Sequence, residues 1–266
     1  MKFKESEFEL MLFTTNTELA KESIAYGING IFIDWENKDK DKRQEGFSTQ
    51  INYDSPEDLK RMRTAIDATI LCRLNKFNPA YSSDEINTAI DLGADELLFP
   101  MVESPAEIEA ALHIINGRIK TGMLIETDRA ATHAASFAHL PLSRIYIGLN
   151  DLHISSKSAH IFDPLTDGTV AQIKSNFKHI PIGVGGITHP HSGNPVPATL
   201  LMQQYAQLNM NFSFLRRSFL KDVQQYGLQE TLTAIRTYLS LLDTSLYTAD
   251  HIASSIKALT LSSVHA

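Results

Sequence analysis

The sequence contains only one cysteine, Cys72, among its 266 residues. A lone cysteine cannot form an intrachain disulfide, which is typical of a protein that works in a reducing compartment. Cys72 directly precedes Arg73 in an apolar, strand-like stretch, so the two side chains should point to opposite faces of the strand. We therefore predict that Cys72 is a buried structural thiol that faces the helical layer.

The chain also lacks an excess of basic residues and a long apolar run near its start. Its 24 Lys and Arg residues stand against 31 Asp and Glu residues, which gives a formal net charge of −7. Nucleic-acid-binding modules usually carry a basic face, so we expect no nucleic-acid partner. The stretch MKFKESEFELMLFTT is acidic, and its apolar run is too short for a signal peptide or a membrane span. We expect a cytoplasmic protein with no membrane partner.

What the chain does contain is a regular alternation of strand-like and helix-like segments. With 43% hydrophobic and 21% charged residues it can bury a large core, and we predict a single domain over 1–266. Helix starts are indicated by Ser55, Ser82 and Ser104, each followed three residues later by an acidic residue, as in a capping box. Eight strands are predicted, near residues 8–15, 30–36, 68–75, 96–102, 120–127, 143–151, 180–187 and 211–217.

Charged residues follow four of these apolar segments. They occur in IFIDWE (Asp34 and Glu36), ILCRLN (Arg73), MLIET (Glu126) and IYIGLND (Asp151). Eight alternating strands could form either a barrel or a doubly wound open sheet. An open sheet gathers its site at one switch point, whereas these charged ends follow the second, third, fifth and sixth strands, which favours a barrel with one shared mouth. We predict an α/β fold, a (β/α)8 TIM barrel over about 8–220, with a C-terminal helical extension over about 221–266. Carboxylates and an arginine at one mouth suggest a divalent metal that holds an anionic substrate.

The order and spacing of several motifs resemble one enzyme family. GINGIFIDWEN, LCRLN, GADELLFPMVESPAEIEAA, LIET and GLNDL resemble the HpcH/HpaI aldolase and citrate lyase β-subunit family of the phosphoenolpyruvate/pyruvate superfamily. The resemblance extends over roughly 25–190, and PMVES and the pair LIET and GLNDL are its most specific parts. It implies a divalent-metal-dependent carbon–carbon lyase or aldolase, or the reverse condensation. The substrate would be a 2-oxo acid such as pyruvate or oxaloacetate, which reacts through a metal-stabilised enolate.

The resemblance also implies roles for individual residues. In the family, Mg²⁺ or Mn²⁺ lies on the residues that match Glu126 and Asp151, and hard cations prefer such carboxylate oxygens. Arg73 would donate to the oxygen or carboxylate on which negative charge develops. Asp34 and Glu36 face the same mouth, where Glu36 would orient metal-bound water, and Asp34 would act in catalysis or only hydrogen-bond neighbouring loops. For Glu126, Asp151 and Arg73, a network of ion pairs at the barrel mouth is the alternative. The predicted substrate-binding residues are Arg73, Asn37, Gly148, Asn150, Gly185 and Gly186.

Asn37 departs from the family pattern. In the aldolase branch this position resembles a histidine that takes part in proton transfer, and asparagine cannot titrate. The proton would then be handled by metal-bound water, by a substrate group or by another residue. His153 is a candidate because, on an extended chain, it would point the same way as Asp151; a loop histidine without a catalytic role is the alternative. His189 and His191 have H-x-H spacing, but flanking prolines and the lack of a third nearby ligand argue against a metal site there.

Three glycines in IGVGGIT, Gly183, Gly185 and Gly186, leave two interpretations open. Glycines after the seventh strand of a barrel often bring backbone N–H groups against a phosphate, so a phosphorylated substrate or coenzyme A could bind there. Alternatively, small residues let the barrel close near the substrate. The other functions left open are a citrate-lyase-like thioester lyase, a phosphate-binding barrel enzyme and a non-catalytic ligand-binding relative.

The last part of the chain carries more apolar side chains than closing one barrel needs. Leu232, Ile235, Leu239 and Leu242 share one face of a predicted helix. The resemblance implies trimers or hexamers whose last helices pack on neighbouring copies. We therefore expect a homo-oligomer.

Overall fold

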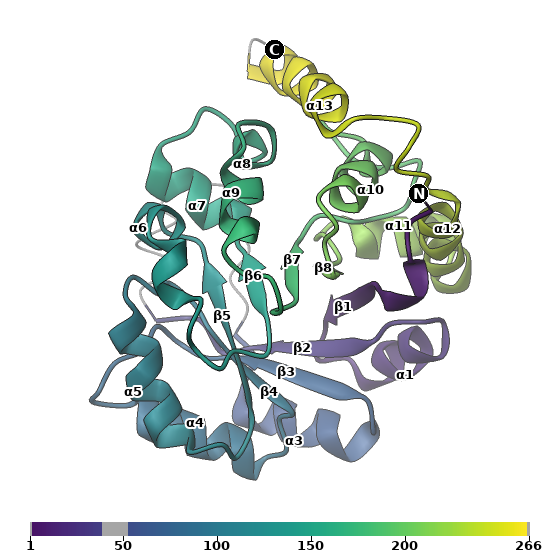
Figure 1. Cartoon of the computed structure of the whole chain (residues 1–266). Helices are drawn as coiled ribbons and strands as arrows, with labels where there is room; N and C mark the ends of the chain where they lie inside the picture. Colours follow the sequence, from purple (N-terminus) through teal and green to yellow (C-terminus); the bar gives the residue numbers. More distant parts are fainter. Residues whose placement is uncertain (1, 39–52, 265–266) are drawn as a thin grey trace.

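Eight parallel strands close into a barrel in the order of the sequence (Figure 1). The computed structural model describes residues 2–38 and 53–264. Each strand pairs with its sequence neighbour, and the last strand pairs with the first, so the predicted (β/α)8 TIM barrel is confirmed. The strands are β1 (Glu9–Phe13), β2 (Gly30–Asp34), β3 (Thr69–Arg73), β4 (Glu96–Phe99), β5 (Lys120–Ile125), β6 (Ile145–Ile147), β7 (Ile182–Val184) and β8 (Phe212–Phe214).

Helices surround the barrel on its outside (Figure 1). Two short 3₁₀ helices, η1 (Glu5–Glu7) and η2 (Ala134–Phe137), supplement them. The α-helices of the described residues are α1 (Thr17–Ala25), α3 (Pro56–Ala65), α4 (Ser82–Asp91), α5 (Pro105–Ile115), α6 (Asp128–Thr132), α7 (Leu149–Ser156), α8 (Asp163–Thr166), α9 (Thr169–Ser175), α10 (Ala198–Gln207), α11 (Phe219–Tyr226), α12 (Leu228–Leu241) and α13 (Ala249–Val264).

All eight predicted strands are present, but most are shorter than predicted. The largest difference concerns β6, which was expected over 143–151 but spans Ile145–Ile147, with α7 beginning at Leu149. The motif IYIGLND therefore contains a strand, a one-residue turn at Gly148 and the first turn of a helix. Asp151 still lies at the carboxyl end of the barrel, but on a helix rather than on an extended chain.

The alternation of side chains along the strands creates two separate apolar cores. Side chains of one parity fill the inside of the barrel, and those of the other parity pack between the barrel and the helices. Cys72 belongs to the outer core and is fully buried, as predicted, so burial raises the pKa of its thiol well above the ordinary value. We call the residues inside the barrel the inner core. They are Met11, Phe32, Leu71, Leu98, Leu124, Phe212 and Phe214, and Phe13 and Tyr146 pack against them.

The three predicted helix starts have different outcomes. Ser55 and Asp58 form the full capping box, with each side chain accepting a backbone N–H of the other residue. Ser104 is the N-cap of α5, but its hydroxyl donates to Glu107, 3.4 Å away, instead of capping the helix. The capping box at Ser82 is wrong, because Ser82 is the first helical residue and accepts the Asn78 N–H at 2.9 Å.

A charged group is buried at the amino end of the barrel. Arg144, directly before β6, donates through Nε to the Glu96 carboxylate at 2.8 Å and through Nη1 to Glu9 at 3.0 Å. Glu9 and Glu96 are the first residues of β1 and β4, and the guanidinium also lies 5.0 Å from the Phe212 ring. We call Glu9, Glu96 and Arg144 the basal cluster. Glu96 is completely buried, whereas Glu9 is 45% exposed.

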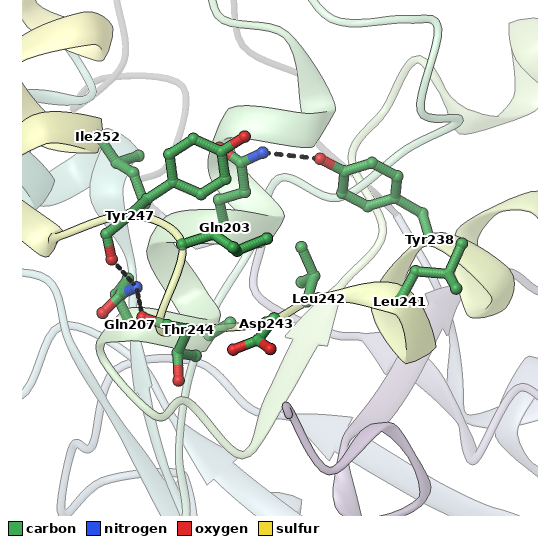
Figure 2. A pocket seen from close by; sticks show the side chains of 11 residues that line it. Gln203, Gln207, Tyr238, Leu241, Leu242, Asp243, Thr244, Tyr247 and Ile252 are labelled. Carbon is green, nitrogen blue, oxygen red and sulfur yellow. Dashed lines mark hydrogen bonds between the residues drawn. The ribbon is translucent and has the colours of Figure 1, made fainter. Parts of the chain in front are cut away.

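The C-terminal helices bury one face and expose another. Leu232, Ile235, Leu239 and Leu242 are all buried, as their helical spacing predicts, and α12 contacts α1 and η1. α13 packs instead on α10 and α8. A pocket of about 200 Å³ lies between α10, α12 and the start of α13, with Tyr238 and Gln203 hydrogen-bonded across it (Figure 2). None of the charged strand ends lines this pocket.

Within residues 2–38 and 53–264, no helix combines the length and the apolar character needed to cross a membrane.

Candidate active site

Arg73 lies at the centre of the barrel mouth and is held by two carboxylates. Its Nε and Nη2 donate to the two oxygens of Asp34 at 2.8 and 2.7 Å, and its Nη1 lies 3.3 Å from a Glu36 oxygen. Asp34 is the last residue of β2 and Arg73 the last of β3, and they occupy paired positions of the sheet. The prediction that Asp34 and Glu36 face the same side of the chain is therefore correct.

The charge of Arg73 is fixed by this arrangement. Burial alone would lower the pKa of the guanidinium, but the carboxylates of Asp34 and Glu36 outweigh it and hold the pKa well above its ordinary value. Asp34 is fully buried and Glu36 is 2% exposed, so both interactions are poorly screened by solvent. The bidentate pair with Asp34 orients the Arg73 guanidinium.

Glu126 follows β5 and is oriented by a strained turn. The backbone N–H of Met101 donates to Glu126 Oε1 at 2.7 Å. Met101, in the motif PMVES after β4, has a φ of 52°, which is unusual for a residue with a side chain. Gly148 provides the space on the other side, because a Cβ at that position would lie 2.6 Å from Glu126 Oε2.

The Glu126 carboxyl is electrostatically unfavourable as an anion. Burial raises its pKa to about 8, and the charges of Asp151 and Glu36 add to the shift, while Arg73 and the Met101 N–H oppose it. Asp151 is therefore close enough to Glu126 for their charges to interact. We call Asp34, Glu36, Arg73, Glu126 and Asp151 the mouth cluster.

The first turn of α7 holds Asp151 and Asn150 at the mouth. The Asn150 side-chain Nδ2 is buried and has no hydrogen-bond partner among the described residues. An unsatisfied buried donor is costly, and this one lies beside Asp151 in the sequence. An anionic or carbonyl oxygen in the mouth is the kind of ligand that could accept its N–H.

The geometry assumed for His153 is wrong. The chain is helical rather than extended at this point, so His153 lies about 200° around the helix from Asp151. Its Nδ1 lies 2.9 Å from the Ser158 hydroxyl. The shared orientation that made His153 a candidate for proton transfer is therefore absent.

Asn37 lies just beyond the mouth cluster, in the loop after β2. Its backbone N–H donates to the Asn75 side chain at 3.1 Å, and the Lys38 N–H donates to the same oxygen at 2.9 Å. Asn75 in turn donates to Glu85 at 2.7 Å. The hydrogen bonds from Asn37 and Lys38 to Asn75 join the loops after β2 and β3 and place Asn37 at the edge of the mouth.

The glycines of IGVGGIT make room for large side chains of the inner core. A Cβ at Gly183 would collide with the Phe212 ring, and one at Gly185 would lie 2.5 Å from the Tyr146 hydroxyl. Gly186 has a φ of +126°, which only glycine adopts readily. These contacts support the interpretation that small residues let the barrel close.

His189 and His191 take part in local contacts after β7. The His189 ring stacks on Tyr226 at 4.2 Å, and its Nδ1 accepts the His191 N–H at 3.2 Å. Asp222 accepts hydrogen bonds from Thr188 and from the His189 backbone. Both histidines thus lie in the loop between β7 and α10, and His189 packs against α11.

Three groups near the mouth escaped the sequence analysis. Tyr146 lies two residues before Gly148 and points into the barrel. The alternation of side chains along a strand could have shown this inward direction from the sequence. Asp54 accepts the Asp34 N–H at 2.8 Å, and burial raises its pKa to about 6. Arg217, after β8, interacts electrostatically with Asp151 and Tyr146. Asp54 and Arg217 lie in loops, where no periodicity shows the direction of a side chain.

The mouth suits a hard divalent cation that has few protein ligands. The described residues contain no group of three His, Cys, Asp or Glu side chains placed to hold a metal ion. Glu126 and Asp151 supply two carboxylates, and Mg²⁺ commonly binds one or two carboxylates and takes its other oxygens from water and substrate. Burial and the charges of Asp151 and Glu36 raise the pKa of Glu126, and a cation beside the carboxylate would offset both effects. The donor set therefore fits Mg²⁺ or Mn²⁺.

Comparisons with known proteins identify the fold. No family model matches the sequence, and no curated protein matches it. The structure is similar to an HpcH/HpaI aldolase from Desulfitobacterium hafniense at 10% identity and a TM-score of 0.56, covering 86% of this chain and 96% of that one. The barrel is the fold that such aldolases have. The resemblance read from the motifs is thus confirmed at the level of the fold.

Two further similar structures are complexes with ligands. One is protein CitE from Mycobacterium tuberculosis in complex with magnesium and pyruvate, at 14% identity and a TM-score of 0.61, covering 94% of this chain and 99% of that one. The other is a citrate lyase β-subunit from M. tuberculosis complexed with oxaloacetate and magnesium, at 14% identity and a TM-score of 0.60. It covers 88% of this chain and 98% of that one.

Proposed function

We propose that this protein is a member of the HpcH/HpaI aldolase and citrate lyase β-subunit family. Its activity would be that of a divalent-metal-dependent carbon–carbon lyase, or the reverse condensation, acting on a 2-oxo acid such as pyruvate or oxaloacetate. The observation that carries the proposal is the buried Glu126 carboxyl beside Asp151 and Arg73 at the barrel mouth. The similar structures support it, because two of them are complexes of magnesium with a 2-oxo acid.

Glu126 and Asp151 would hold the cation, and Mg²⁺ or Mn²⁺ would supply Lewis-acid polarisation of the substrate's keto oxygen. The Met101 N–H holds one Glu126 oxygen, which leaves Oε2 as the oxygen beside Gly148. Glu36 lies 3.3 Å from Arg73 and contributes to the field at Glu126, which suits a residue that orients water at the mouth.

Arg73 would stabilise the enolate that forms when the carbon–carbon bond breaks. A guanidinium fixed by Asp34 and Glu36 needs no reorganisation as negative charge develops on the substrate. Asn150 Nδ2 is a second donor that an oxygen of the 2-oxo acid could satisfy. Gly148, Gly185, Gly186 and Asn37 would border the bound acid.

Hydrogen–deuterium exchange at the pyruvate methyl group tests this function without knowledge of the second substrate. In D₂O, NMR should show loss of the methyl proton signal with Mg²⁺ or Mn²⁺ present and none after chelation. Exchange that persists after exhaustive chelation would contradict a metal-dependent enolate. Binding of Mg²⁺ and pyruvate without exchange would support the non-catalytic relative instead.

The phosphate-binding alternative receives less support from the structure. Gly183 and Gly185, which suggested it, accommodate Phe212 and Tyr146. A thioester as the second substrate is compatible with the same enolate chemistry. Pyruvate exchange tested with and without inorganic phosphate distinguishes the phosphate-binding enzyme, which phosphate should inhibit strongly.

We also propose a cytoplasmic homo-oligomer that associates through its C-terminal helices. Leu241 is 74% exposed, Leu246 68% and Leu261 53%, all on α12, α13 or their connection. Leu241 and Leu246 line the same pocket beside α10, and apolar side chains exposed near one another are typical of association sites. Light scattering at micromolar concentration should give the mass of a trimer or hexamer, and Leu241→Lys with Leu246→Lys should reduce it. A monomeric wild-type protein would refute this.

A further inference from the structure

Tyr146 is unusual among the side chains that fill the barrel. The side chains of all seven inner-core residues, and of Phe13 beside them, contain no nitrogen or oxygen. Seven of these residues are at most 2% exposed, whereas Tyr146 is only partly buried. The inner core thus has one phenol packed against it, and that side chain is less completely buried than its neighbours.

The strand register places the Tyr146 hydroxyl at the level of the mouth cluster. The Tyr146 backbone pairs with Leu124 of β5 and Gly183 of β7. Its hydroxyl reaches Gly185, two residues farther along β7, where a Cβ would lie only 2.5 Å away. By the same count along β5, the residue two beyond Leu124 is Glu126. The ring therefore rises by one inward-facing layer and ends level with the carboxylate.

The surroundings fix the ring and leave its oxygen near charged groups. Phe214 packs against Tyr146 edge to face, with ring centroids 4.5 Å apart. The Gly185 backbone hydrogen-bonds to the phenol oxygen, and Arg73, Glu126 and Asp151 are close enough to act on it electrostatically. A hydroxyl that accepts a backbone N–H still has its own proton to donate.

We propose that the Tyr146 hydroxyl is the proton donor to the enolate carbon of the 2-oxo acid. This inference rests on the function proposed above and assigns the proton that Asn37 cannot supply. His153 does not compete for the role, because it lies on another side of α7 and contacts Ser158.

The proposed step is balanced. The electron pair of the enolate carbon–carbon double bond takes the Tyr146 proton and becomes a C–H bond, while the enolate oxygen regains its keto double bond. The O–H bond breaks and leaves its electron pair on the phenol oxygen. The resulting tyrosinate faces the Gly185 N–H and the Arg73 guanidinium, and water entering the mouth returns the proton. In the reverse direction the phenol first gives its proton to water in the mouth, and the tyrosinate oxygen then removes a proton from the methyl group.

The protonation state of Tyr146 suits a donor. Burial raises the pKa of its hydroxyl to about 12, Arg73 opposes the shift, and Glu126 adds to it. The phenol is therefore protonated at neutral pH.

The test compares Tyr146→Phe with Tyr238→Phe. Phenylalanine keeps the ring against Phe214 and removes only the oxygen, and Tyr238 is a control on α12, where its hydroxyl meets Gln203. Methyl exchange should slow by about 10²-fold or more in Tyr146→Phe, the usual contribution of a positioned proton-transfer group. Calorimetry with Mg²⁺ and pyruvate should show binding within about twofold of wild type, because this readout does not depend on turnover. Tyr238→Phe should change neither.

Each outcome separates the inference from the proposed function. If wild-type protein binds neither Mg²⁺ nor pyruvate, the proposed function fails. If wild type exchanges and Tyr146→Phe exchanges within a few-fold of it, Tyr146 is not the donor. If Tyr146→Phe folds but loses pyruvate binding, Tyr146 serves binding rather than proton transfer, and the inference is overturned.

Discussion

The two ends of the barrel each contain an arginine held by a fully buried carboxylate, yet they differ in what surrounds that pair. At the amino end, Arg144 pairs with Glu96, and the remaining carboxylate, Glu9, is 45% exposed to solvent. At the carboxyl end, Arg73 pairs with Asp34, and two more buried carboxylates, Glu36 and Glu126, lie nearby.

This difference teaches that a buried ion pair alone is not a sign of function. At the amino end the buried Glu96 carboxylate is matched by Arg144, so among the described residues no buried negative charge is left without a partner there. At the mouth, burial raises the pKa of Glu126, the charges of Asp151 and Glu36 add to the shift, and a proton or a cation relieves it. The same contrast matches the general division of TIM barrels into a structural amino end and a catalytic carboxyl end.

The largest effect should follow from removing one of the two proposed metal-binding carboxylates at the mouth. Glu126→Gln or Asp151→Asn should abolish Mg²⁺ binding by calorimetry and pyruvate exchange by NMR, because the cation loses one of two protein ligands. The thermal midpoint of the metal-free protein should stay the same or rise, since repulsion at the mouth is relieved. Glu9→Gln in the basal cluster is the matched control and should leave Mg²⁺ binding unchanged. Metal binding that survives in both mouth variants would disprove the ligand assignment.

The next largest effect concerns the basal cluster. Arg144→Met leaves Glu96 buried without its partner, which should lower the free energy of unfolding by about 3–5 kcal/mol. Urea denaturation measures this, and the double variant Arg144→Met with Glu96→Leu should recover most of the loss because no lone charge remains. Below the unfolding transition, Mg²⁺ affinity should match wild type. A loss under about 1 kcal/mol would show that the basal pair does not secure the barrel.

Arg73→Lys tests whether the guanidinium fork matters beyond its charge. A lysine cannot hold two coplanar donors against Asp34, so pyruvate exchange should slow on the order of 10²-fold with Mg²⁺ binding retained. Arg61→Lys is the control, since Arg61 is 54% exposed on α3. If Arg73→Lys exchanges pyruvate protons at nearly the wild-type rate, Arg73 has only a structural role as the partner of Asp34, like Arg144 with Glu96.

The smallest effect is a pH dependence confined to the mouth. Burial, Asp151 and Glu36 raise the pKa of Glu126 to about 8, so the metal-free carboxyl carries a proton at pH 7 that a bound cation must displace. Mg²⁺ affinity should therefore increase from pH 6 to about 8, at most about tenfold per pH unit, and then level off. Without metal, the free energy of unfolding should fall over the same range, because the native state holds a proton that the unfolded chain has lost. Calorimetry in two buffers of different ionisation enthalpy would detect the released proton, and an affinity independent of pH would contradict the assignment.

The fold and most of the mouth cluster could be predicted from the sequence for a physical reason. Strand ends in a parallel barrel meet at one mouth, so Asp34, Arg73 and Glu126 could be placed together from their apolar neighbours alone. The boundary of β6 could not, because Leu149 and Leu152 fit the apolar pattern of a strand as well as that of a helix. That ambiguity produced the wrong orientation of His153.

The basal cluster and Tyr146 were missed for another reason. Glu96 and Arg144 lie 48 residues apart, and nothing in their local sequence announces the pairing. Tyr146 occupies an inward-facing strand position, and an aromatic side chain at such a position is equally consistent with a role in packing alone. Only the register of three strands brings its hydroxyl to the height of Glu126.

The left-handed turn at Met101 has a consequence for how this barrel could be engineered. A glycine there would relax the backbone, and selection for heat resistance alone would favour it. The same substitution would widen the range of conformations open to this loop, so the N–H that donates to Glu126 Oε1 would be held less firmly. A variant stabilised in this way would hold the Glu126 carboxylate less rigidly. One substitution would therefore raise thermal stability and lower metal affinity.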